Sequence, residues 1–455
     1  MNGLAKYRIP AALGVALLGG LLFPPSGAAQ QAERLTLRQS IDLALKQSVV
    51  LHAAREGVQG AEAQRKEALT GFLPKLSTSY SYTRLNKEPY FNFPGVPPLI
   101  PASTMITGTR DNYNWQIEAR QPLFAGGAIV ANYETNRLGA EIARHEEAAV
   151  AQELVREVKI AYFTIIKAER MLAVARQSLE QRQAHRDRAR GFYETGLTPR
   201  NDLLHAEVES AKGEQSLLRA GNALEMAKAR FNTLLRRDIG APLEIEDTLS
   251  EPPASGPLES CIAAALERRP ELRAAALRAE QSRSLVKLSA SDYYPSVSAV
   301  GNYGRYGDTA ALSGTSYKDR ENWQALVVAN WNFWEWGKTK NRVDAGRSKE
   351  NQAEDLLAHA RDQVVLEVKN AYLLLQEAEK QLPVAKKAIA QAEENFRINS
   401  ERYQEQVETS LAVIDAQTLL AGAKADYATA LAEAFIQMAR LEKAMGETDK
   451  GEERP

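Results

Sequence analysis

The sequence predicts a mainly α-helical protein with a small β part, organised as two similar halves that each contain a long helical hairpin. Small and apolar residues recur at intervals of three and four between Gly127 and Glu194, as in a coiled coil. The same arrangement returns 210 residues later, as in Tyr162 and Tyr372, and this constant offset indicates an internal repeat. Four short segments with alternating side chains lie between the helical stretches and predict strands.

The first hairpin begins after Gly127 and turns at residues 195–199. No proline interrupts the chain between Gly127 and Pro199, so one helix over this span would be roughly 100 Å long. A helix of that length exceeds what a compact domain needs. The expected contact stripe comprises Ala151, Leu154, Val158, Ala161, Ile165, Ala168, Leu172, Ala175 and Leu179. The returning helix is expected from about Asn201 to Arg236.

The second hairpin repeats the first with the same length on both sides of its turn. Tyr193 and Tyr403 are again 210 residues apart, as are Ala206 and Ala416. Its expected stripe comprises Val364, Val368, Ala371, Leu375, Ala378, Leu382, Ala385, Ile389, Ala392 and Phe396. Because Pro383 lies inside this helix, we expect a kink nearby.

The chain divides into five expected segments. Residues 1–29 resemble a secretory signal peptide, with Lys6 and Arg8 before a short apolar core and small residues at positions 27 and 29. The mature protein would begin at Gln30, so no Cys stands directly after the cleavage site to carry an acyl anchor. The alternative to a cleaved signal is an N-terminal anchor helix. Residues 30–238 form the first repeat, 239–257 a linker, 258–446 the second repeat and 447–455 a disordered tail.

Each repeat is expected to begin with a helix and two strands. In the first repeat a helix over Leu37–Gly71 precedes a strand over Leu76–Thr83. A loop over Asn86–Gly108, which holds five prolines, separates this strand from a second one over Asn112–Phe124. In the second repeat the same unit returns 221 residues later, with strands at about residues 296–306 and 322–333.

Aromatic residues are concentrated in the predicted strands. All five Trp residues lie in or beside two of the strands, and an apolar strand face with Trp or Tyr near its ends fits a membrane β-barrel. A small soluble β-sandwich is the alternative. Four strands cannot close a barrel, and an open sheet edge cannot face lipid, so three chains giving twelve strands are inferred. The expected lipid-facing residues are Tyr80, Tyr82, Trp115, Trp323, Val327 and Trp331.

Composition points away from several other functions. The net charge is −1, which does not suggest nucleic acid as a partner. The single Cys261 excludes an internal disulfide and a cysteine-based metal cluster. No catalytic, cofactor-binding or metal-ligating constellation is found, so no enzyme is predicted. We expect four of the five histidines, His52, His185, His205 and His359, to be solvated helix residues.

Taken in order, these motifs resemble the TolC family of outer-membrane efflux proteins over nearly the whole mature chain. Three features support the resemblance: Phe72-Leu73-Pro74 before a predicted strand, Pro122–Gly127 at the end of another, and the hairpin segment from Tyr193 through Ala206. The resemblance implies a homotrimer in which four strands per chain complete a twelve-stranded outer-membrane β-barrel. The duplicated hairpins would form a periplasmic α-barrel.

The implied function is passive conduction of substrates outward, from a periplasmic adaptor protein and an inner-membrane transporter to the exterior. The hairpin tips would form the periplasmic entrance and the adaptor contact. Carried over by position, the adaptor-contact tips are Gly196, Leu197, Thr198, Gln406 and Val407, and the entrance acids are Asp415, Asp202 and Glu408.

Three positions depart from the family pattern. Ala412 replaces a companion acid of Asp415, Glu408 stands where some members have a basic residue, and Gln406 replaces the turn glycine. A periplasmic coiled-coil adaptor or scaffold remains the alternative, although it would not need four aromatic strands in two matched pairs. The exported substrate and the class of pump are left open.

Overall fold

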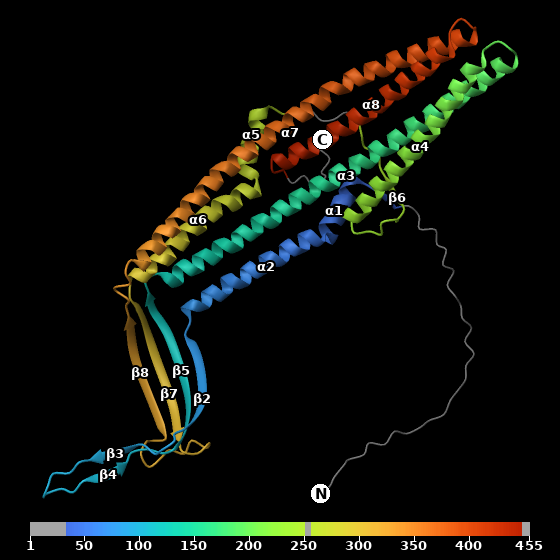
Figure 1. Cartoon of the computed structure of the whole chain (residues 1–455). Helices are drawn as coiled ribbons and strands as arrows, with labels where there is room; N and C mark the ends of the chain where they lie inside the picture. Colours follow the sequence, from blue (N-terminus) through green and yellow to red (C-terminus); the bar gives the residue numbers. More distant parts are fainter. Residues whose placement is uncertain (1–32, 251–255, 448–455) are drawn as a thin grey trace, which may run out of the picture.

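The computed structural model describes residues 33–250 and 256–447. The predicted signal peptide lies outside the described residues, as does most of the predicted tail. Two long helical hairpins run side by side. A four-stranded sheet extends from the end of the helical part that lies opposite the two hairpin turns (Figure 1). The predicted fold class, mainly helical with a small β part, is confirmed.

The helices repeat with identical lengths. The long helices α3 (Ala128–Glu194) and α7 (Lys338–Gln404) have 67 residues each, and the returning helices α4 (Arg200–Leu234) and α8 (Ser410–Ala444) have 35 each. Helix α7 is continuous through Pro383, and the kink expected there remains a prediction. Within the described parts of the chain, no helix has the length and apolar character that a membrane span requires.

The single helix expected over Leu37–Gly71 was a wrong prediction, because it is broken into α1 (Leu37–Gln47) and α2 (Val49–Leu69). Ser48 separates them in an extended conformation, and its side chain accepts a hydrogen bond from the Leu51 N–H at 3.3 Å. The break between α5 (Leu258–Arg268) and α6 (Pro270–Ala290) falls at the equivalent position. There Pro270 disfavours helical geometry at the preceding residue and starts the next helix.

The main sheet has the order β2-β5-β7-β8, and all its neighbours are antiparallel. Its strands are β2 (Lys75–Arg84), β5 (Asp111–Ala125), β7 (Ser296–Gly307) and β8 (Glu321–Asn330). The predicted loop over Asn86–Gly108 is wrong in part, since it contains a small hairpin of β3 (Tyr90–Phe93) and β4 (Ser103–Ile106).

Strand β8 ends at Asn330, before the predicted end at Phe333. Asn330 pairs with Ser296, so the next partner in this register would be Pro295, which has no N–H to donate to the ladder. Trp331 therefore lies beyond the strand, where its indole Nε1 donates to the Tyr293 carbonyl at 3.2 Å. Its assignment as a strand residue was wrong.

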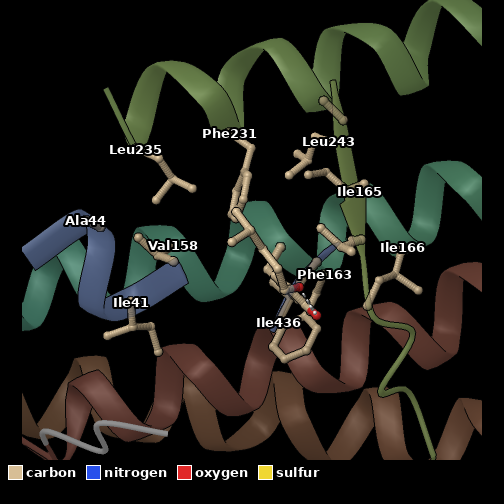
Figure 2. Packing of buried hydrophobic residues seen from close by; sticks show 14 of the residues in the cluster. Ile41, Ala44, Val158, Phe163, Ile165, Ile166, Phe231, Leu235, Leu243 and Ile436 are labelled. Atoms are coloured by element: carbon tan, nitrogen blue, oxygen red, sulfur yellow. Dashed lines mark hydrogen bonds between the residues drawn. The ribbon is translucent and has the colours of Figure 1, made fainter. Parts of the chain in front are cut away.

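The described residues of the predicted linker include part of the core. Within it, β6 (Leu243–Ile245) pairs in parallel with β1 (Glu33–Leu35). The side chains of Leu243 and Ile245 are buried in the largest apolar cluster. In Figure 2, residues from α1, α4, α8 and β6 lie against α3 around Val158, Ile165 and Ile166. The expected stripe of α3 is thus the centre of the core.

Tyr162 ties α3 to this strand pair. Its side chain is fully buried, and its hydroxyl lies 2.7 Å from the Glu246 carbonyl and 3.3 Å from that of Leu35. Burial raises the pKa of Tyr162 to about 12, so the hydroxyl keeps its proton and donates it at any ordinary pH. The hydroxyl therefore supplies a buried partner for backbone groups at the end of β1 and β6.

Removing this hydroxyl should destabilise the core. We expect Tyr162→Phe to lower the free energy of unfolding by about 1–2 kcal/mol, because buried carbonyls lose their partner. The matched control is Tyr372→Phe in the second repeat, where the residue is half-buried and its hydroxyl accepts a hydrogen bond from Gln376 at 3.2 Å. Thermal unfolding in detergent compares the two variants, and equal losses would contradict a special role for Tyr162.

Candidate functional site

The main sheet has two chemically different faces. Paired residues of adjacent strands point to the same side, so the register assigns each side chain to a face. One face carries Tyr80, Tyr82, Tyr113, Trp115, Ile117, Tyr303, Trp323, Ala325 and Val327. The opposite face carries Ser77, Ser79, Ser81, Asn112, Asn114, Gln116, Glu118, Asn302 and Gln324. The first is therefore an aromatic and apolar face, and the second is mainly polar.

Five of the six residues predicted to face lipid lie together on the aromatic face. Trp323 is 75% exposed and Val327 67% exposed in the single chain. The ring of Tyr82 lies 4.7 Å from that of Tyr113, and Trp115 meets Tyr303 edge to face at 6.2 Å. Aromatic side chains on this face thus come from all four strands, and the Arg305–Glu321 ion pair lies among them.

The hairpin tips have the same backbone geometry in both repeats. At the first tip Gly196 has φ 76°, and at the second Gln406 has φ 61°, so both occupy the left-handed region. The Leu197 N–H bonds the Phe192 carbonyl at 2.8 Å, and the Val407 N–H bonds the Arg402 carbonyl at 3.0 Å. Both helices thus end in a Schellman motif. Leu197 and Val407 are exposed at the ends of the molecule farthest from the sheet (Figure 1).

The three candidate acids lie in different surroundings. Asp415 is exposed on α8, and Glu408 lies 3.7 Å from Arg402 and accepts the Thr409 N–H at 3.1 Å. Asp202 is half-buried in the first turn of α4. It is close enough to Tyr403 on the other hairpin to help raise the pKa of that phenol, although burial of Tyr403 is the larger cause.

His185 is a residue that the sequence interpretation placed wrongly. It is 2% exposed rather than solvated, and its Nε2 lies 2.8 Å from Ser410 Oγ on the second hairpin. Its ring packs on Tyr403 with centroids 5.0 Å apart. A usable signal was present, because Phe192 follows His185 by seven residues and lies on the same helical stripe. His52, His205 and His359 are exposed as predicted.

The family model described as "Outer membrane efflux protein" matches residues 40–235 and 261–447, which is most of the chain. The chain belongs to the outer membrane efflux protein family. It is an outer-membrane efflux channel that reaches into the periplasm, and it is not an enzyme.

Solved outer-membrane channels share the fold of this efflux protein. The VceC protein of Vibrio cholerae is 18% identical, with 90% of this chain and 96% of that chain covered and a TM-score of 0.77. The CmeC channel of Campylobacter jejuni is 16% identical over 90% and 85% of the two chains, with a TM-score of 0.78. The MtrE channel of Neisseria gonorrhoeae is 20% identical over 90% and 89%, with a TM-score of 0.72.

Chemistry at a metal is not suggested by the geometry of this efflux protein. Over residues 33–250 and 256–447, no three His, Cys, Asp or Glu side chains are placed to hold a metal ion. Cys261 is buried as a free thiol, and burial raises its pKa.

The two tip turns provide a matched pair of substitutions. Gln406 holds a left-handed conformation that favours glycine, so Gln406→Gly should stabilise the second turn by about 0.5–1 kcal/mol. Gly196→Gln should destabilise the first turn by a similar amount. Amide hydrogen exchange at Val407 and Leu197 measures each opening free energy. A slower exchange at Leu197 in Gly196→Gln would contradict the argument.

Proposed function

We propose that three copies of this chain close a twelve-stranded barrel in the outer membrane and a helical tunnel beneath it. The amphipathic sheet carries this proposal. Within the described residues, β2 and β8 each have a strand neighbour on one side only, and such edges cannot face lipid. Joining β8 of one copy to β2 of the next satisfies both edges and leaves no free edge after three copies.

The aromatic face then meets lipid, and the polar face lines the water-filled duct. Tyr80, Tyr82, Trp115, Trp323 and Val327 are the proposed lipid contacts, and Trp331 is a contact just beyond β8. This division follows the pattern of outer-membrane barrels, with apolar side chains outward and polar side chains inward. The proposed segments are a signal peptide over 1–29, repeats over 30–238 and 258–446, a connecting segment over 239–257 and a tail over 447–455.

The channel conducts substrates passively to the cell exterior. It receives them from a periplasmic adaptor protein and an inner-membrane pump. The duct supplies no energy source of its own, and family membership implies such partners. The proposed adaptor contacts are the exposed turn residues Gly196, Leu197, Thr198, Gln406 and Val407. The proposed entrance residues are Asp415, Asp202 and Glu408. The CmeC protein, which has the same fold, is an outer-membrane channel.

Assembly is the direct test of this proposal. Native mass spectrometry of detergent-extracted protein should give a trimer, because single chains leave both sheet edges open. Monomers alone under conditions that preserve the fold would contradict the proposal.

The assignment of the sheet faces is tested by a pair of arginine substitutions on β8. Val327→Arg places a charge on the aromatic face and should cost about 2–4 kcal/mol in bilayer folding near the midplane. Gln324→Arg places the same charge on the polar face and should cost much less. Folding titrations into lipid vesicles compare them, and a larger cost for Gln324→Arg would reverse the assignment.

The entrance role of Asp415 is tested electrically. Three copies of Asp415 near one axis would attract cations, so Asp415→Asn should reduce cation selectivity or block by divalent cations. Asp426→Asn, farther along α8, serves as the control. Single-channel recordings in planar bilayers measure both. Conductance, selectivity and block equal to wild type in Asp415→Asn would exclude Asp415 from the entrance.

A further inference from the structure

Near the tips, the two hairpins of one chain meet through polar side chains instead of the apolar stripe used in the core. Lys424 Nζ lies 3.2 Å from Gln177 Oε1, and Gln417 Nε2 donates to the Gln181 carbonyl at 3.1 Å. Arg188 donates to Ser400 Oγ at 3.3 Å. With His185 between them, these α3 residues follow at intervals of four, four and three, which places them on one side of the helix.

His185 is the most deeply buried member of this row. Three helices meet there: α3 contributes the imidazole, α8 contributes Ser410 and α7 contributes Tyr403. The Tyr403 ring also packs on Phe192 with centroids 5.4 Å apart, so it lies against two side chains of α3. We call this contact of His185, Phe192, Tyr403 and Ser410 the hairpin joint.

The hairpin joint has no place for a protonated imidazole. Within the described residues, His185 Nδ1 has no hydrogen-bond partner, so a second N–H would be a buried, unsatisfied donor. Ser410 is the first residue of α8, where the helix dipole presents its positive end. Arg188 adds a positive charge from α3 itself. Burial first, and then Arg188, lower the pKa of His185 to about 4.

The other charged groups around the joint do not offset this. On α4, Asp202 acts on Tyr403 and is half-buried. On α3, Arg182 is paired with Glu209 of α4 at 2.6 Å. At the end of α7, Arg402 lies beside Glu408, and on α8 the carboxylate of Asp415 is exposed. None of these acids is hydrogen-bonded to His185.

We propose that His185 is a proton-sensitive contact between the two hairpins, which holds them together when neutral and separates them when protonated. Acidification would then loosen α3 from α7 and α8 just behind the tips. That this loosening also widens the channel entrance rests on the proposed function of the tips.

The direction and size of the effect follow from proton linkage. A histidine with an ordinary pKa of about 6.5 in the separated state binds protons there more readily than in the closed joint. Stability of the closed joint is therefore complete above about pH 6.5 and falls as the pH drops toward 4. Between pH 7 and pH 5 the ratio of separated to closed joints should rise roughly 20-fold.

The first experiment measures the joint without using channel activity. Exchange of the imidazole C2 hydrogen, followed by mass spectrometry, gives the pKa of each histidine in the detergent-solubilised full chain. His185 should titrate well below the ordinary range of a histidine side chain. Amide exchange around residues 185 and 403, corrected for its intrinsic pH dependence, should rise on acidification in wild type and not in His185→Gln.

His185→Gln stays neutral and keeps a donor for Ser410, and His205→Gln is the matched exposed control. If His185→Gln does not assemble, Ser410→Ala replaces it and should raise amide exchange around residue 185 at pH 7. A pKa of His185 in the ordinary histidine range, or acid-induced exchange that persists in His185→Gln, would overturn the proposal.

The second experiment asks whether the joint acts on conductance. Single-channel recordings at pH 7 and pH 5 should show more frequent open states at pH 5 in wild type and in His205→Gln, but not in His185→Gln. If acid loosens the hairpin joint while conductance stays constant, the proposal for His185 is supported. The same result would contradict the proposal that the tips form the channel entrance.

Discussion

The structure depends on the burial of one stripe of α3. Val158, Tyr162 and Ile165 are fully buried where α1, α4, α8 and β6 all meet this helix. Helix α3 packs against α2, α4, α6 and α8, and most helical stability in proteins comes from packing of an apolar face. This stripe therefore fixes how both hairpins, the short helices and the connecting segment are arranged. The sheet and the tips extend from opposite sides of it.

The sequence predicted those features that depend on periodicity, and it missed those that depend on a single partner. The long helices, the turns and the four main strands follow from spacing that continues over many residues. The break at Ser48 and the early end of β8 depend on one capping side chain and one proline in the partner strand. The pairing of β6 with β1 joins short segments far apart in the chain. The burial of His185 was missed because a histidine is compatible with either environment.

The two repeats share lengths but have diverged where the backbone is unusual. Gly126 and Trp336 occupy equivalent positions with φ near 59° and 51°, as Gly196 and Gln406 do at the tips. A left-handed conformation favours glycine, so at these two positions the second repeat retains the geometry with a less suitable residue, and at Arg236 and Gly446 the relation is reversed. The two repeats are therefore more alike in backbone conformation at these positions than in the residues that adopt it. The second repeat also contains Pro383 where the first has Ala173.

The distance along α3 from Tyr162 to the tip has a mechanical consequence. About 33 residues separate Tyr162 from the first turn, which corresponds to roughly 50 Å of helix. A rigid rod of that length converts a rotation of about 5° at its fixed end into a displacement of roughly 4 Å at its free end. Small changes in packing around Tyr162 are thus amplified at the tips, with the core as the pivot and α3 as the lever arm. An outside partner that pushes on the tips gains the same mechanical advantage in reverse.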